Sequence, residues 1–286
     1  MQQSGFKCIA CTHGLGTLVL ADCRDLYLSL PYRVDYWKCD ECGLVQQSPL
    51  PEDTSPFYLD YPIHSKKSRW SNTLRRWLMG SSYYPARPVP APCKLLDYGC
   101  GDGWFLQSCQ GKNYQLIGFE RDPEHALNLS RSLEIPVESN LAKLLANQAG
   151  TVDIVTMNFV VEHLTDLDQA FSDIYALLRP GGLFYFSAPN INSIEFKLFK
   201  RKWHGLDPPR HISFPDDRVI TLLANRHGFQ LEQSRNIPFP PGIAGSIPTL
   251  LTGKFRYPLF LLSMPLALVV NFLRPDSARG YWLRKA

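Results

Sequence analysis

The chain has 286 residues, of which 45% are hydrophobic, and a formal net charge of +4. This length and apolar content exclude a disordered chain and allow one full α/β domain with smaller additions. The modest charge gives no argument of its own for nucleic-acid binding. Residues 1–5 are polar and do not resemble a secretory signal, so we predict a cytoplasmic chain whose eight cysteines stay reduced.

Two Cys-x-x-Cys pairs stand near the N-terminus. They are Cys8 with Cys11 and Cys39 with Cys42. In a reducing compartment this spacing is typical of a tetrahedral Zn²⁺ site with four thiolate ligands. We therefore predict a zinc ribbon over residues 1–50, with the zinc in a structural role. Two unrelated thiol pairs or a redox site are the alternatives, and His13 is a weaker candidate ligand.

The segment between the two pairs contains apolar runs at residues 17–20 and 27–30. These runs predict the strands of a small antiparallel sheet. Such a short ribbon cannot bury a large core, so the metal must supply much of its folding free energy.

A linker and a predicted lid helix occupy residues 51–92. The linker is rich in proline, and we predict a helix over about residues 65–79, with an apolar stripe and several basic side chains. The basic side chains form either a solvated surface or a contact for an anionic acceptor such as a phosphate. The sequence leaves both interpretations open.

Residues 95–103 are the most informative stretch of the chain. They consist of an apolar strand, the acidic residue Asp97 and then glycines at alternate positions, which are Gly99, Gly101 and Gly103. Glycines at these positions let the main chain approach a nucleotide-like ligand. A glycine-rich turn alone is weak evidence, so the interpretation depends on the segments that follow.

Three later segments fall where a cofactor site needs them. Glu120 ends the second predicted strand, where a carboxylate can accept hydrogen bonds from both ribose hydroxyls of an adenosine. Residues 153–158 predict a buried strand that ends at Asn158. Residues 178–182 predict a helix end and a turn before a strand at 183–188.

From about residue 93 to 235 these motifs resemble the class I S-adenosylmethionine (SAM)-dependent methyltransferases. Enzymes that transfer hydride usually carry Gly-x-Gly-x-x-Gly without the leading acid. The resemblance implies an α/β, Rossmann-like sheet in a SAM-binding domain over residues 93–240. It also implies that the glycine loop and Glu120 hold SAM, with Asp97 and Asn158 beside its methionine part. A Rossmann-like domain with another ligand, or with an inactive site, is the alternative.

Glu162 and His163 follow the strand at 153–158 and are predicted to face the acceptor. His163 is the candidate general base because the unperturbed pKa of histidine is about 6.5. The alternative is that this pair caps and orients the next helix. Some quinone O-methyltransferases hold a divalent ion with Glu-x-x-Glu-His, but here Phe159 occupies the first glutamate position.

Residues 203–214 form a second unusual stretch, at the place where acceptor-binding insertions occur in this family. Histidine, aspartate and arginine alternate there with aromatic residues and prolines. Related methyltransferases carry a similar Pro-x-His pattern before the next helix. We therefore predict that His211 either contacts the acceptor or orients a loop. In similar enzymes a tyrosine-bearing segment closes over SAM, which makes Tyr58 and Tyr61 candidate lid residues.

Residues 257–273 are almost free of charge and have basic residues on both sides. About 17 residues is the lower limit for spanning a bilayer. Strands predicted at 229–235 and 280–284 belong to one sheet, so the apolar segment must leave and re-enter the same core. We predict an apolar hairpin within residues 241–286 that makes a peripheral contact with the inner membrane surface. Burial in the protein or in a dimer is the alternative.

A zinc module in front of a SAM domain resembles the arrangement of sugar C-methyltransferases and related polysaccharide-cluster enzymes. We therefore predict methyl transfer, to carbon or oxygen, on a sugar or lipid-linked glycan intermediate. An RNA methyltransferase is the second hypothesis, although the modest charge and the apolar segment argue against a nucleic-acid partner. A non-enzymatic SAM-domain scaffold is the third, and the oligomeric state stays open.

Overall fold

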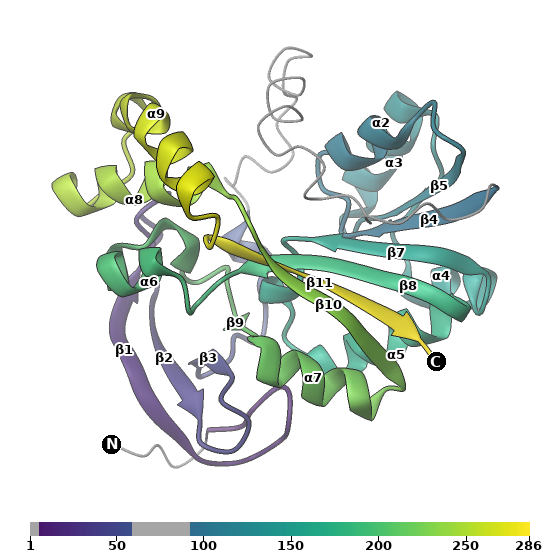
Figure 1. Ribbon diagram of the computed structural model, residues 1–286, viewed down its shortest axis with the longest axis horizontal. Coiled ribbons are helices and arrows are strands. Elements are labelled where there is room, and N and C mark those ends of the chain that lie inside the picture. Colours follow the sequence, from purple (N-terminus) through teal and green to yellow (C-terminus); the bar gives the residue numbers. More distant parts are fainter. Residues whose placement is uncertain (1–5, 59–91) are drawn as a thin grey trace.

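The computed structural model describes residues 6–58 and 92–286, and two β-sheets organise this part of the chain (Figure 1). The larger sheet has the strand order β10-β11-β8-β7-β4-β5-β6, and the smaller sheet has the order β1-β2-β3-β9. The predicted helix at 65–79 and Tyr61 lie outside the described residues.

The larger sheet is mostly parallel. Its strands are β4 Cys93–Tyr98, β5 Tyr114–Phe119, β6 Val137–Glu138, β7 Val152–Asn158, β8 Leu178–Pro189, β10 Phe229–Ile237 and β11 Ala278–Lys285. Only β11 runs antiparallel to its neighbours β8 and β10 within this sheet. The fold is therefore the predicted Rossmann-like α/β fold. The predicted helix end is confirmed, because α5 ends at Leu177. The predicted turn at 178–182 was wrong, because β8 already begins at Leu178.

Helices cover both faces of this sheet. They are α2 Trp104–Cys109, α3 Pro123–Leu133, α4 Leu141–Gln148, α5 Leu167–Leu177 and α7 Asp217–Arg226. Helix α6, Ile194–Phe199, instead packs on α8 and in an apolar cluster with the ribbon residue Tyr36. Successive side chains of a strand point to opposite faces. Leu96 and Phe184 accordingly join α5 and α7 in one core, while Leu95 and Leu183 join α2 in another.

The smaller sheet contains the N-terminal ribbon. Its strands are β1 Gly16–Arg24, β2 Arg33–Cys39, β3 Val45–Ser48 and β9 Ser213–Phe214. The run at 17–20 lies in β1, as predicted. Strand β9 comes from the stretch 203–214 and pairs with β3, so the ribbon sheet is completed by a much later part of the chain.

The strand predicted at residues 27–30 was wrong. The Asp25 carboxylate accepts hydrogen bonds from the backbone N–H groups of Tyr27 at 2.8 Å and Leu28 at 2.9 Å. A side chain that bonds to nearby main chain offers an alternative to a strand ladder. The run therefore forms a loop around Asp25, and the second strand begins only at Arg33.

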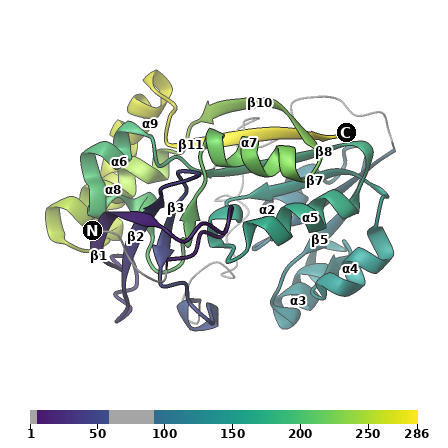
Figure 2. The same ribbon diagram turned by 90° about the horizontal axis from the view of Figure 1, so that it is seen from below.

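Two helices connect β10 to β11. They are α8 Pro240–Thr252 and α9 Tyr257–Leu273, and they pack on each other through Ile243, Ala244 and Ala267. The predicted strands at 229–235 and 280–284 lie in β10 and β11 and pair with each other. The helix pair stands at one end of the molecule, far from α3, in both views (Figures 1 and 2). Among the described residues, no helix combines the length and the apolar character needed to cross a bilayer.

Candidate functional site

The glycine loop between β4 and α2 has a backbone that requires glycine. Gly99, Gly101 and Gly103 have φ angles of 76°, 52° and 72°, in the left-handed region that other residues rarely adopt. A Cβ atom at Gly99 would lie 2.7 Å from Val160, and one at Gly103 would lie 2.6 Å from Leu129. Two of the three glycines are therefore required by packing as well as by conformation.

Glu120 lies beside this loop. Its carboxylate accepts a hydrogen bond of 3.0 Å from the backbone N–H of Gly101. The Nε2 atom of His125, in the first turn of α3, lies 2.7 Å from the carbonyl oxygen of the same glycine. No sequence signal pointed to His125, because a single histidine near a helix start has no characteristic spacing. The loop is thus held from both sides, and ribose binding by Glu120 stays a prediction.

Asp97 is the last but one residue of β4, and Asn158 ends the neighbouring strand β7. Asp97 is buried and accepts a hydrogen bond of 2.7 Å from the Thr156 hydroxyl. Burial raises the pKa of Asp97 to about 7, although the hydrogen bond from Thr156 lowers it. The Nδ2 atom of Asn158 is buried without a hydrogen-bond partner among the described residues. Such an unsatisfied donor favours a ligand that accepts a hydrogen bond there.

Glu162, His163 and His211 form one cluster. Their potential ligand atoms all lie within 4.8 Å of one another, and the two imidazole centroids are 4.7 Å apart. Glu162 and His163 belong to the short 3₁₀ helix Val161–His163, which follows β7. The three residues could therefore transfer protons to and from a ligand, or hold a divalent cation.

The hydrogen bonds of the two histidines fix their tautomers. Nδ1 of His163 lies 2.9 Å from the carbonyl oxygen of Arg210, and Nδ1 of His211 lies 2.8 Å from that of Gly205. A carbonyl oxygen can only accept, so we assign the proton of each ring to Nδ1. Each Nε2 is then left with a free lone pair. Burial lowers the pKa of both rings, that of His211 to about 3, which keeps them neutral.

Glu162 is a buried carboxyl with an exposed fraction of 0%. Neither carboxylate oxygen has a hydrogen-bond partner among the described residues. Burial raises its pKa to about 8. The alternative that Glu162 and His163 cap the next helix was wrong, because the Asp166 side chain caps α5 by accepting from Gln169 N–H.

A buried ion network adjoins the cluster through Arg210, whose carbonyl oxygen contacts His163. The Arg210 side chain is fully buried, and its guanidinium lies 3.0 Å from Asp25 and 2.6 Å from Asp207. Burial opposes ionisation, but the hydrogen bond from Arg210 lowers the pKa of Asp207 to about 2. The Tyr36 hydroxyl donates to the carbonyl oxygen of His211 at 2.9 Å. The ribbon therefore positions the loop that carries His211, a contribution that sequence patterns did not reveal.

Tyr58 reaches the same cluster from the start of the linker. Its hydroxyl oxygen lies 3.0 Å from Nδ1 of His163. The ring is mostly buried, and burial raises the pKa of its hydroxyl. This places Tyr58 beside the predicted general base, while its role as a lid stays a prediction.

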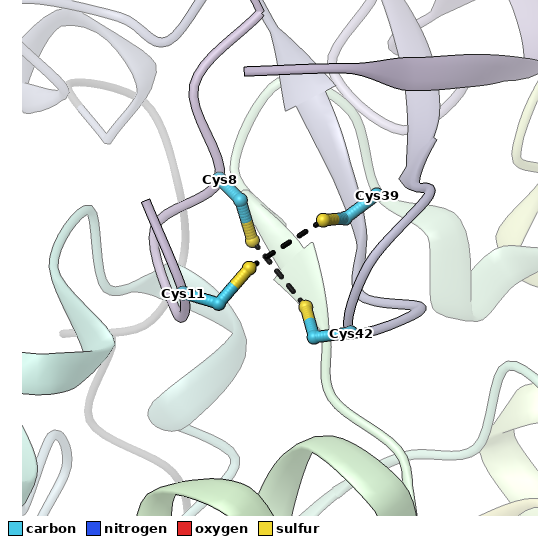
Figure 3. A group of neighbouring side chains, drawn as sticks. All are labelled: Cys8, Cys11, Cys39 and Cys42. Atoms are coloured by element: carbon cyan, nitrogen blue, oxygen red, sulfur yellow. Dashed lines mark hydrogen bonds between the residues drawn. The ribbon is translucent and has the colours of Figure 1, made fainter. Parts of the chain in front are cut away.

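The four predicted zinc ligands converge in the ribbon (Figure 3). The Sγ atoms of Cys8 and Cys42 are 3.5 Å apart, as are those of Cys11 and Cys39, and all four lie within 4.8 Å of one another. With Zn–S bonds of about 2.3 Å, a tetrahedral site has S···S distances of about 3.8 Å. The spacing fits a metal site and is too long for disulfides, whose S–S bond is about 2.05 Å. His13 is not part of this cluster among the described residues.

The remaining cysteines have no such arrangement. They are Cys23, Cys93, Cys100 and Cys109, all buried.

Helix α7 fixes the cysteine ribbon to the larger domain, because Arg226 donates to the carbonyl oxygen of Ala10 at 2.7 Å. The ribbon and the larger domain also share one hydrophobic core.

Comparisons with known proteins agree with this geometry. A family described as a methyltransferase domain matches residues 69–234. A ubiquinone biosynthesis O-methyltransferase of Xanthomonas axonopodis pv. citri is 32% identical over 123 residues, which cover 41% of this chain and 51% of that protein. A protein of Mycolicibacterium smegmatis named "Probable S-adenosylmethionine-dependent methyltransferase" is 30% identical over 155 residues, or 52% of this chain and 57% of that one. The chain thus spans about half the length of these curated relatives.

The fold has counterparts among solved structures. A SAM-dependent methyltransferase from Archaeoglobus fulgidus has a TM-score of 0.50 and 16% identity, with 80% of this chain and 99% of that chain covered. The predicted methyltransferase class is confirmed by the family match, which includes more than half of the chain, and the specific resemblance to sugar C-methyltransferases stays a prediction. The chain belongs to the methyltransferase domain family, and its fold is that of the class I SAM-dependent methyltransferases.

Proposed function

We propose that the chain transfers a methyl group from SAM to a hydroxyl oxygen of its acceptor, with His163 as the general base. The observation that carries this proposal is the pair of imidazole rings whose Nδ1–H groups are both committed to backbone carbonyls. Both imidazole rings belong to one cluster with Glu162, which follows β7. The glycine loop is adjacent, because Gly99 packs against Val160.

The residues that would hold SAM lie at the carboxyl edge of the sheet, which is the usual ligand position in such folds. They are Asp97, Gly99, Gly101, Gly103, Glu120 and Asn158. The unpartnered Nδ2 of Asn158 fits a cofactor that carries a carboxylate at its methionine end. When bound, SAM supplies an activated methyl group on a sulfonium and needs no metal for that activation.

The protein's own contribution is to orient the acceptor and to accept its proton. His163 is neutral because burial lowers its pKa, so its Nε2 can accept the hydroxyl proton. The positive charge that then forms on His163 favours the ionised form of the neighbouring Glu162. His211 offers a second lone pair that can orient the hydroxyl. The Arg210 carbonyl accepts a hydrogen bond from His163, and the Tyr36 hydroxyl donates to the His211 carbonyl, so both residues are held in place.

The acceptor we favour is a sugar or a lipid-linked glycan intermediate. Its support is the predicted ribbon-plus-SAM-domain arrangement and the ribbon contact with the acceptor loop. A precursor in ubiquinone biosynthesis is the second candidate, since relatives that match over about half their length carry that name. In both cases the reacting atom that we propose is an oxygen.

We also propose that Cys8, Cys11, Cys39 and Cys42 bind one structural Zn²⁺ ion. The converging Sγ atoms and the small core of the ribbon support this assignment. The ion would hold β2 in place, so that Tyr36 can donate its hydrogen bond to the His211 carbonyl.

The test uses SAM tritiated in its methyl group, the purified chain and a lysate divided into lipid extract, soluble small molecules and RNA. Label in a sugar-containing lipid or a soluble sugar supports the first acceptor, and label in a quinone precursor supports the second. Label in RNA, or in no fraction, contradicts the proposal. A rate that collapses on chelation and returns with Mg²⁺ would show that the Glu162 cluster holds a cation rather than a proton.

The variant His163→Asn tests the general base. The asparagine Nδ2 can keep the hydrogen bond to Arg210 but has no counterpart of Nε2. We expect the methylation rate to fall at least about 100-fold, with SAM affinity unchanged in calorimetry. His13→Asn is the matched control, because His13 lies outside the cluster. A rate within twofold of the native chain in His163→Asn would exclude this role.

A further inference from the structure

Helix α9 exposes an apolar surface that the methyltransferase site does not use. Of its residues, only Ala267 and Asn271 are buried, while Leu262, Phe272 and Leu273 are 77%, 87% and 76% exposed. Single exposed apolar side chains are ordinary on protein surfaces, but a contiguous set marks an interaction site. The end of α8 also carries two exposed leucines, Leu250 and Leu251.

The exposed side chains of α9 lie on one face. Leu262, Leu266, Val269 and Leu273 follow the i, i+4, i+7, i+11 spacing of a single helical face. Ala267 and Asn271 lie on the opposite face, where Asn271 accepts a hydrogen bond from Phe239 N–H at 2.7 Å. The helix is therefore tied to the body along one narrow stripe and presents leucine, valine and phenylalanine outward.

Basic residues lie at both ends of α9, and one of them, Arg274, pairs with Asp276 at 3.2 Å. No aspartate or glutamate occurs between Glu232 and Asp276. Lys254 and Arg256 precede α9 and Arg274 follows it, and all three are exposed. An apolar face with basic residues at both ends is the pattern of a helix that lies in the interface of an anionic membrane.

The helix pair is coupled to the acceptor loop. The backbone N–H of His204 donates to the Ser246 hydroxyl at 2.9 Å, and the Thr249 hydroxyl donates to the Lys202 carbonyl at 2.6 Å. Gly245 leaves room for the His204 imidazole, which a Cβ at that position would overlap. Helix α8 therefore packs directly on the segment that leads to His211.

We propose that α8 and α9 dock on the surface of an anionic lipid membrane, with α9 lying in the plane of the headgroups. If the proposed methyl transfer holds, this docking would bring the acceptor loop to a membrane-borne acceptor. A second copy of the chain fits the surface less well. In a two-fold pair of α9 helices, basic ends would meet basic ends in either direction, and the neighbouring carboxylate of Asp276 is already paired with Arg274.

The test measures co-sedimentation of the full chain with vesicles of phosphatidylcholine alone or with phosphatidylglycerol. Binding is measured without SAM, and SAM affinity is determined separately, so that a failure of docking and a failure of the proposed activity are distinguishable. We expect binding only to the anionic vesicles and a decrease with rising salt.

The double variant Leu262→Glu with Phe272→Glu places charges at two of the most exposed apolar positions of α9. We expect vesicle affinity to fall at least about tenfold, with unchanged SAM affinity and circular dichroism. Leu127→Glu, on α3 at the far end of the molecule, is the matched control because that leucine is 50% exposed. It should bind vesicles as the native chain does.

Two kinds of result would overturn the proposal. The first is a native chain that binds no vesicles, or a double variant that binds them equally well. The second is a native chain that is a dimer by light scattering and becomes a monomer in the double variant, which would assign the face to a second copy.

Discussion

The proposed cofactor end and the proposed acceptor end of the site differ in the sequence separation of the residues that contact each other. At the cofactor end, the Gly101 N–H donates to Glu120, only 19 positions away. At the acceptor end, Tyr36 donates to His211 across 175 positions, and Arg210 donates to Asp25 across 185. The cofactor end is thus a local βα unit, whereas the acceptor end exists only when the ribbon is folded against the larger domain.

This difference separates the two kinds of damage that a substitution can cause. A change in the glycine loop should impair SAM binding and leave the ribbon intact. A change in the ribbon should disturb the loop of His211 and leave SAM binding intact. The following predictions test that separation, beginning with the largest expected effect.

Cys39→Ser should release the metal and unfold the ribbon, because structural zinc contributes on the order of 10 kcal/mol to such small modules. Methylation should then be lost, since Tyr36 lies on the strand that ends at Cys39. Metal content by mass spectrometry and SAM affinity by calorimetry are the measurements. Cys23→Ser is the control, a buried thiol outside the cluster. A variant that retains one metal per chain would show that the ligand set is wrong.

Asp25→Asn should destabilise the chain by about 3 kcal/mol, because it leaves the buried Arg210 with only one carboxylate. The melting temperature and the methylation rate should both fall, while SAM affinity stays the same. Asp22→Asn is the matched control, since its ion pairs with Arg24 and Arg33 are at the surface. Loss of SAM binding in Asp25→Asn would mean that the two ends are not independent.

Gly101→Val should weaken SAM binding at least about 100-fold, because a β-branched residue is strained at a φ of 52°. The chain should remain folded by circular dichroism. Gly111→Val is the control, with a φ of 73° and nothing within 4 Å of its added Cβ. Equal SAM affinity in both variants would remove the glycine loop from the cofactor site.

Glu162→Gln should change the pH dependence of stability. The pKa of Glu162 is raised by burial to about 8, above its unfolded value of 4.5, so the native carboxyl binds its proton more tightly than the unfolded one. Its favourable contribution is complete below about pH 4.5 and is lost as the pH rises through about 8. The stability of the glutamine variant should therefore increase relative to that of the native chain as the pH rises over that range. We expect a difference on the order of 1 kcal/mol, because water that reaches the buried carboxylate reduces the cost of its charge.

The measurement is the melting temperature at pH 5 and pH 9, with Glu134→Gln as an exposed control. A stability difference that does not depend on pH would show that Glu162 is solvated or paired in solution. If the native chain is instead stabilised relative to the variant at high pH, a cation neutralises Glu162.

The parts of the fold that the sequence predicted are those with local causes. The glycine loop, the apolar strands and the paired cysteines can each be recognised from the spacing of residues within a short segment. The run at 27–30 was predicted wrongly for the same reason, because its apolar pattern does not show that the Asp25 carboxylate bonds the backbone of the loop. A single aspartate is too common to predict such a turn.

By itself, the sequence determined the fold class, the family, the thiol pairs and the acid-free apolar segment, since these depend on composition and short-range periodicity. Only the tertiary structure decided that β9 completes the ribbon sheet, that Arg210 is neutralised by Asp25, and which nitrogen of each histidine is free. These features depend on atoms brought together across most of the chain. Their physical basis is the burial of charges and polar groups, which must find partners wherever the fold supplies them.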